Sequence, residues 1–234
     1  MKKEMLINRS PVYRKFNLET ATLRELNGFM SPMSIIDIDD EMVSARKLAI
    51  CDVSWLPRAG FKGKDTIKWL TAKGFKIPEQ PNSLEKTGDG SLIIRLGITE
   101  ILILTDPNHR GELSVQLTSE WEATNFESID MRTFYLPRQD SHACFLISAE
   151  YAPQLFAKLC AVDLSANHFP NLNVVQTTVA RLGSIIIRND LPDTLSYLIL
   201  TDSTSAEYLW DCIIDTGREF EVKAIGCHSI LKLI

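Results

Sequence analysis

The stretch AICDVSWLPRAGFKGKDTIKWL, residues 49–70, contains the pattern that decides the fold. Residues 53–61 fit a strand, and Ile67, Trp69 and Leu70 then recur at a spacing that buries one side of a short helix. The stretch therefore predicts a strand followed at once by a helix.

A β-hairpin is predicted downstream of that helix. SLIIRLG at 91–97 and EILILT at 100–105 are rich in β-branched and aliphatic residues, and the connection between them contains no proline. The polar stretch at 110–124 then fits a further helix. Together these segments make one unit of strand, helix and hairpin.

The same succession begins again in the second half of the chain. The strands are predicted at 141–148, 172–188 (two strands about an Arg181–Leu182–Gly183 turn) and 195–201, and the helices at 149–164 and 203–220. Ser203 or Ser205 can cap the last helix, and Thr204 with Glu207 would form a capping box. This repetition indicates an internal duplication.

The predicted fold class is therefore α+β, with duplicated strand–helix–hairpin units in one compact body. The first unit is expected over 46–130 and the second over 131–234. Residues 1–45 are expected to form an irregular N-terminal arm that wraps this body.

Composition narrows the class of function. The chain has 234 residues, 45% of them hydrophobic, and its 30 acids and 25 bases are interspersed without a basic stripe, so no nucleic-acid partner is expected. Neither an apolar run of membrane-spanning length nor a cleavable leader is apparent, which predicts a cytoplasmic protein with no membrane contact. Five cysteines without a C-x-x-C pair and four scattered histidines predict neither a disulfide framework nor a metal site.

Several blocks of the sequence, in order, resemble a known family. The stretch at 49–70, SLIIRLGITEILIL at 91–104 and the segment at 196–226 are similar to blocks of the glycine-cleavage T-protein (aminomethyltransferase) family. LPRAGFKG, RLGITEILIL and AEYLWD are most similar to the gamma subunit of heterotetrameric sarcosine oxidase, and the similarity spans roughly residues 45–232. The resemblance implies a tetrahydrofolate-binding fold without the family's C-terminal barrel domain, and tetrahydrofolate as the cofactor.

The acids that the resemblance would place at the active site are not clearly retained. The catalytic acid falls near Asp89, which is displaced by a residue within a Gly-Asp-Gly turn and is more typical of turn chemistry. In the later strand the aromatic residue is Tyr197, but Leu198 stands where the family has a glutamate. The exit arginine falls on Ile230 or, with a gap, on Lys232.

Other residues are candidates for holding the cofactor. Gln176 and Thr178 form a polar cluster in a strand, with Arg188 as a cation for the glutamate tail of folate, although an outward strand face explains them as well. Asp193 is an acid in the turn before Tyr197. Asp52 is interpreted as structural, because a carboxylate at a strand end can accept a backbone N–H and hold Ser54.

Three functions follow, and the third is a simple self-associating scaffold that binds no ligand. The first is a non-catalytic or accessory protein of one-carbon or amine metabolism, which associates with an amine-oxidising flavoenzyme or with itself. The second is a stand-alone aminomethyltransferase-like enzyme in which Asp89 or Asp193 acts as the general acid. Because the chain has no G-x-G-x-x-G sequence, any flavin is expected to belong to a partner.

Overall fold

The computed structural model describes residues 8–107, 112–124 and 130–234, which form two compact units. Unit 1 contains the described chain up to Trp55 together with His142–Asn171 and Thr177–Ile234, and unit 2 contains Leu56–Ser141 and Leu172–Gln176. The predicted boundaries near residues 46 and 131 stay a prediction.

Unit 2 is built on a five-stranded antiparallel sheet with the order β6-β7-β8-β5-β9. Its strands are β5 (Arg58–Lys62), β6 (Ser83–Lys86), β7 (Ser91–Arg95), β8 (Glu100–Thr105) and β9 (Phe134–Leu136). The predicted hairpin is confirmed, because β7 and β8 pair antiparallel with Ile93 opposite Ile103.

Helices of unit 2 bury their apolar sides against this sheet. They are α2 (Thr66–Ala72) and α3 (Leu113–Ala123), with the short α4 (Arg138–Ser141) after β9. Trp69 and Leu70 are buried as predicted, and the Trp69 ring centroid lies 5.1 Å from that of Phe61 on β5. Leu117 of α3 joins the same core cluster. Aliphatic and aromatic burial thus holds the two helices to the sheet.

Unit 1 contains a six-stranded sheet with the order β11-β12-β13-β10-β4-β14. Its strands are β4 (Ala49–Asp52), β10 (His142–Ser148), β11 (Val174–Val179), β12 (Leu182–Arg188), β13 (Ser196–Asp202) and β14 (Lys223–Ile225). The helical segments are α1 (Ile38–Lys47), α5 (Ala152–Leu159), η2 (Ser203–Ser205), α6 (Ala206–Thr216), η3 (Gly217–Phe220) and α7 (Cys227–Lys232).

Helices α5 and α6 cover one face of this sheet. Tyr197 pairs opposite Ile147, and Phe145 lies two residues before Ile147, so these three side chains point to the same side. Phe156 of α5 packs edge-on against Tyr197 at 5.2 Å, and Trp210 of α6 packs edge-on against Phe145 at 5.4 Å. The two helices therefore share a single layer.

The two units repeat one order of elements. Unit 2 runs β5, α2, β6, β7, β8, α3, and the later part of the chain runs β10, α5, β11, β12, β13, α6. The strand order is equivalent as well, with β6-β7-β8-β5 in one sheet and β11-β12-β13-β10 in the other. Each run thus contains four strands and two helices in the same order.

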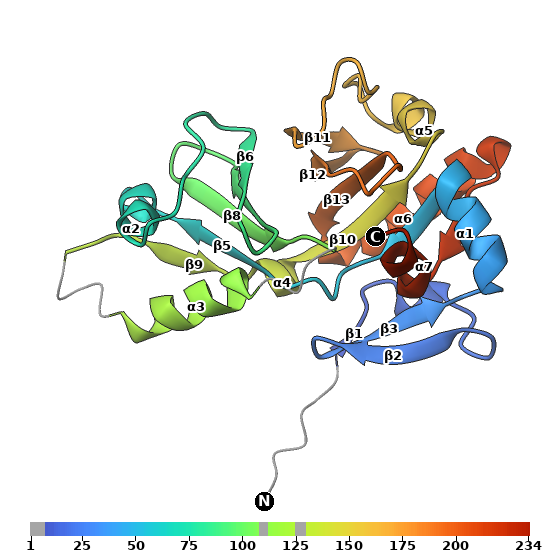
Figure 1. Cartoon of the computed structure of the whole chain (residues 1–234), viewed down its shortest axis with the longest axis horizontal. Coiled ribbons are helices and arrows are strands. Elements are labelled where there is room, and N and C mark those ends of the chain that lie inside the picture. Colours follow the sequence, from blue (N-terminus) through green and yellow to red (C-terminus); the bar gives the residue numbers. More distant parts are fainter. Residues whose placement is uncertain (1–7, 108–111, 125–129) are drawn as a thin grey trace, which may run out of the picture. The chain divides into compact units, whose positions relative to one another are not determined.

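The N-terminal region is more regular than the sequence predicts. A hairpin of β2 (Thr22–Leu26) and β3 (Phe29–Ser34) pairs with the short β1 (Asn8–Arg9), and η1 (Tyr13–Lys15) separates β1 from β2. Helix α7 packs against β3 and α1 (Figure 1). A Cβ atom on Gly226, just before α7, would lie 2.2 Å from the carbonyl oxygen of Met33, so only glycine permits this approach.

Several local predictions differ from the structure. The strand expected over 53–61 begins only at Arg58 and ends at Lys62. The helix expected over 149–164 ends at Leu159, and Val162 lies beyond it. The turn between β11 and β12 is Ala180–Arg181, where both residues have positive φ, rather than Arg181–Gly183. The cap of the helical segment predicted over 203–220 is Asp202, whose carboxylate accepts from the N–H of Thr204, whereas Ser205 makes no side-chain capping bond.

Candidate functional site

A pocket of about 490 Å³ opens in unit 1, where the ends of several elements meet. Its lining comes from the end of α1, the loop between β10 and α5, the loop between β12 and β13, and the end of α7; the residues are Arg46, Ala149, Glu150, Pro192, Asp193, Thr194, Leu195, Lys232 and Leu233. This volume is within the range of pockets that hold small organic ligands.

Charges of both signs surround an apolar floor in this pocket. Ala149 and Leu233 are 3% and 9% exposed, whereas Arg46, Glu150 and Asp193 are exposed. Lys232 is exposed as well. The pocket therefore offers two cations and two carboxylates to a ligand.

Local contacts bring these elements together. The N–H of Tyr151 donates to the carbonyl of Lys47 at 3.2 Å, which fixes the start of α5 beside the end of α1 and so places Glu150 near Arg46. Glu41 of α1 is fully buried and accepts hydrogen bonds from the N–H groups of Ile35 and Ile36 and from the hydroxyl of Ser229 on α7. The carboxylate of Glu41 thus joins α1 to α7.

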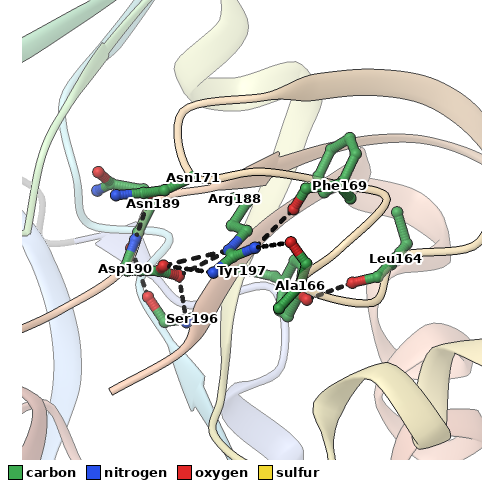
Figure 2. Close-up of polar contacts among 9 residues, drawn as sticks. All are labelled: Leu164, Ala166, Phe169, Asn171, Arg188, Asn189, Asp190, Ser196 and Tyr197. Atoms are coloured by element: carbon green, nitrogen blue, oxygen red, sulfur yellow. Dashed lines mark hydrogen bonds and ion pairs between the residues drawn. The ribbon is translucent and has the colours of Figure 1, made fainter. Parts of the chain in front are cut away.

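Arg188 is the last residue of β12, just before the loop that lines the pocket, and its side chain binds other groups of the protein (Figure 2). Its Nε donates to the Asp190 carboxylate at 3.0 and 3.2 Å, and its Nη2 donates to the same carboxylate at 2.7 Å. Its Nη1 donates to the carbonyls of Ala166 at 3.1 Å and Phe169 at 2.7 Å. Arg188 is 9% exposed, and the ion pair with Asp190 raises the pKa of its guanidinium.

Asp190 in turn fixes the loop that presents Asp193. Its carboxylate accepts from the N–H of Ser196, while its own N–H donates to Oδ1 of Asn171 (Figure 2). Leu191 and Thr194 exchange two backbone hydrogen bonds of 3.0 and 3.1 Å across the Pro192–Asp193 turn. Asp193 adopts φ +54°, a left-handed conformation that aspartate tolerates better than most residues. The acid is therefore held by a rigid turn.

Tyr197 belongs to the interior of unit 1. Its side chain is fully buried, and its hydroxyl donates to the carbonyl of Leu164 (Figure 2). Burial raises the pKa of Tyr197 to about 12. The ring packs between Phe156 and Phe169, with centroids 5.2 and 6.4 Å away.

Gln176 and Thr178 lie on β11 and are exposed. The Gln176 side-chain amide donates to Oδ1 of Asn82 at 2.8 Å and to the carbonyl of Leu96 at 2.6 Å. Neither residue lines the pocket around Asp193. The polar cluster predicted on this strand is thus not brought together with Asp193.

Asp89 occupies the tight turn between β6 and β7. It accepts hydrogen bonds from the hydroxyl of Thr87 and from the N–H and hydroxyl of Ser91, the last two at 3.1 Å. Partial burial would raise the pKa of Asp89, but these hydrogen bonds outweigh burial, and the pKa lies below its ordinary value. These contacts are those of turn chemistry.

Asp52 has the structural contact that the sequence predicts. Its Oδ1 accepts from the N–H of Ser54 at 3.1 Å, and the Ser54 hydroxyl accepts from the N–H of Cys144 on β10 at 3.0 Å. The buried carboxylate therefore orders the end of β4 beside the central strand.

The residues predicted to hold tetrahydrofolate do not all line the pocket around Asp193. Arg188 is engaged by Asp190, Tyr197 is enclosed, and Leu198 is fully buried where the resemblance expects a glutamate. Of the five predicted cofactor residues, Asp193 lines the pocket. A pterin's amino and ring N–H groups need paired acceptors, and a leucine provides none.

Sequence reasoning did not select the pocket residues Arg46 and Glu150, and it considered Lys232 only as a gapped match for the exit arginine. These residues are far apart in the chain and belong to no shared motif. The feature of the sequence that could have indicated them is their position at the ends of helices and strands, because loops between elements often carry functional side chains.

The described residues contain neither a candidate membrane span nor a candidate metal cluster. No helix within 8–107, 112–124 and 130–234 is both long and apolar enough to span a bilayer. In the same residues, no group of three or more His, Cys, Asp or Glu side chains is arranged to hold a metal ion.

Comparisons with known proteins find the fold but no close relative. No protein-family model and no curated protein sequence matches the chain. A chain of heterotetrameric sarcosine oxidase from Corynebacterium sp. U-96, solved with pyrrole 2-carboxylate, is similar with a TM-score of 0.62 and 15% identity over 80% of this chain and 93% of that chain.

The aminomethyltransferase T of the glycine cleavage system from Bartonella henselae is also similar, with a TM-score of 0.67 and 13% identity. The match covers 95% of this chain and 61% of that protein, so this chain spans less than two thirds of its length. The two similarities confirm the predicted resemblance at the level of the fold, which is a mixed α+β fold of the T-protein type.

Proposed function

We propose that this chain is a non-catalytic, accessory protein of amine or one-carbon metabolism, built on the T-protein fold. The observation that carries the proposal is the engagement of Arg188 by Asp190 and two backbone carbonyls. A guanidinium that satisfies three acceptor groups of its own chain stabilises the fold and is not available for a cofactor's carboxylates.

The repeated topology supports an internal duplication as the origin of this frame. Four strands and two helices recur in the same order, with equivalent strand order in the two sheets. Such a frame keeps its stability from buried aliphatic residues, so the polar groups of a cofactor site can be replaced without loss of the fold.

A partner chain supplies the chemistry in this proposal. The similar sarcosine oxidase is a heterotetramer, and an accessory role requires such an assembly or self-association. The proposed partner is an amine-oxidising flavoenzyme. The native complex would then carry the absorption of a bound flavin, whereas the isolated chain would not.

The competing function is a stand-alone aminomethyltransferase. It is favoured by one observation, the position of Asp193 in a pocket of about 490 Å³. The lowered pKa of Asp89 counts against Asp89 as its general acid, because a general acid needs a pKa near the working pH.

One assay separates the two functions. The isolated full-length chain is incubated with tetrahydrofolate and an S-aminomethyl thiol, whose one-carbon unit is already at the oxidation level of formaldehyde. Transfer of this unit to folate, with release of ammonia and the free thiol, is followed. We expect no transfer above the protein-free background, whereas the native flavin-containing assembly oxidises its amine. Transfer that is lost in Asp193→Asn or Asp89→Asn, but retained in the exposed control Asp215→Asn, would establish the enzyme instead.

A further inference from the structure

The four charged side chains of the unit 1 pocket lack partners in the described part of the chain. Arg46, Glu150, Asp193 and Lys232 make no ion pair or side-chain hydrogen bond with any described residue. Some exposed charges elsewhere in unit 1 are paired, such as Lys15 with Asp211 at 2.7 Å and Arg218 with Asp215 at 3.3 Å, whereas others, such as Arg24, make no ion pair with a described residue.

The balance of these charges selects the class of ligand. Two cations and two carboxylates leave no net charge at the rim, so a polyanion would meet the repulsion of two acids and a polycation that of two bases. A ligand that carries one charge of each sign satisfies both sets. The apolar surface of Ala149, Leu195 and Leu233 favours an uncharged hydrophobic body between or beside these charges.

We propose that this pocket binds a free α-amino acid with a large apolar side chain. The guanidinium of Arg46 and the ammonium of Lys232 hold its carboxylate, and the carboxylates of Asp193 and Glu150 hold its ammonium group. The Arg188–Asp190 ion pair and the Leu191–Thr194 hydrogen bonds hold the loop that carries Asp193 in place before the ligand binds. Less conformational entropy is therefore lost on binding.

The geometry is also suited to the size of such a ligand. A pocket of about 490 Å³ is much larger than a single ion needs, and it has an open rim with a buried floor. The inference concerns a site of unit 1 alone and does not depend on the accessory role proposed above.

The test uses a ligand series on the full-length wild-type chain, followed by isothermal titration calorimetry. L-phenylalanine has both charges, N-acetyl-L-phenylalanine lacks the ammonium, and L-phenylalanine methyl ester lacks the carboxylate. We expect L-phenylalanine to bind about tenfold or more tightly than either derivative, since each loses one set of charged contacts. Equal binding of the three ligands, or no binding of any, would overturn the proposal.

Two variants assign the charges. Asp193→Asn is expected to weaken binding of L-phenylalanine about tenfold and to leave binding of N-acetyl-L-phenylalanine unchanged, because that ligand has no ammonium group. Arg46→Gln is expected to weaken binding of L-phenylalanine about tenfold and to leave binding of the methyl ester unchanged, because the ester has no carboxylate. Asp215→Asn and Arg218→Gln are matched controls, because they remove an exposed pair outside the pocket. If the pocket variants bind like these controls, the assignment is wrong, whereas the tetrahydrofolate and transfer assays bear only on the accessory role.

Discussion

Replacing Arg188 with methionine tests whether its guanidinium stabilises the fold. Methionine keeps most of the aliphatic stem and removes the charge, so the Asp190 carboxylate and the carbonyls of Ala166 and Phe169 lose their donor. Breaking a buried ion pair by removing one partner costs about 3–5 kcal/mol. The Asp190 side chain is 22% exposed and can be partly rehydrated, so we expect a loss of about 3 kcal/mol, at the lower end of that range.

The matched control is Lys158→Met. Lys158 pairs with Glu219 in the same unit, but their side chains are 46% and 53% exposed, and such pairs contribute about 0–1 kcal/mol. Arg188→Lys is expected to fall between the two, since a single ammonium cannot reach both the carboxylate and the carbonyls.

Thermal unfolding followed by circular dichroism measures these differences. A loss of about 1 kcal/mol lowers Tm by roughly 2–4 °C in a chain of this size, so Arg188→Met should lower it by about 6–12 °C. Because the two units can unfold separately, hydrogen exchange of residues 164–171 and 189–196 supplies a local measurement. A stabilising role of Arg188 is refuted if Arg188→Met has the same Tm as Lys158→Met and if these two segments keep the wild-type protection against hydrogen exchange.

Three further outcomes are expected. Gly226→Ala should lower Tm by several degrees, because its Cβ would lie 2.2 Å from a backbone oxygen, whereas Gly183→Ala, with open space around it, should not; equal effects would contradict the close approach. Glu41→Ala should cost about 2–3 kcal/mol, because two part-buried N–H groups and the buried hydroxyl of Ser229 lose their acceptor, and Glu41→Gln, which keeps an acceptor oxygen, should cost less in urea unfolding. The folded-state pKa of Tyr197 is raised to about 12, so its contribution to stability is complete below pH 10 and is lost as pH rises toward 12; Tyr197→Phe should flatten that alkaline decline, and an unchanged decline would place its cause elsewhere.

Short-range patterns in the sequence predicted part of the regular structure. The β7–β8 hairpin and the buried side of α2 follow from residues close together in the chain, where β-branched runs and helical spacing act directly. The cap of the helical segment that begins at Ser203 was missed because Asp202 is the final residue of β13 and its carboxylate accepts from the N–H of Thr204, two residues on.

The candidate site could be predicted only in part. Asp193 was identified from its place in a turn, but Arg46 and Lys232 reach the same pocket through α1 and α7, whose packing depends on the buried Glu41. The role of Arg188 could not be predicted, because it depends on whether its guanidinium binds a ligand or a group of the protein. In the structure Asp190, two residues away, binds the guanidinium.

The most direct test of the central claim, that this frame lacks the pterin grip, is a calorimetric titration of tetrahydrofolate into the isolated full-length chain. The control ligand is p-aminobenzoylglutamate, which has the carboxylate tail without the pterin. We expect the two isotherms to be indistinguishable, with no saturable binding that depends on the pterin. A saturable isotherm for tetrahydrofolate that the control ligand does not reproduce would contradict the account.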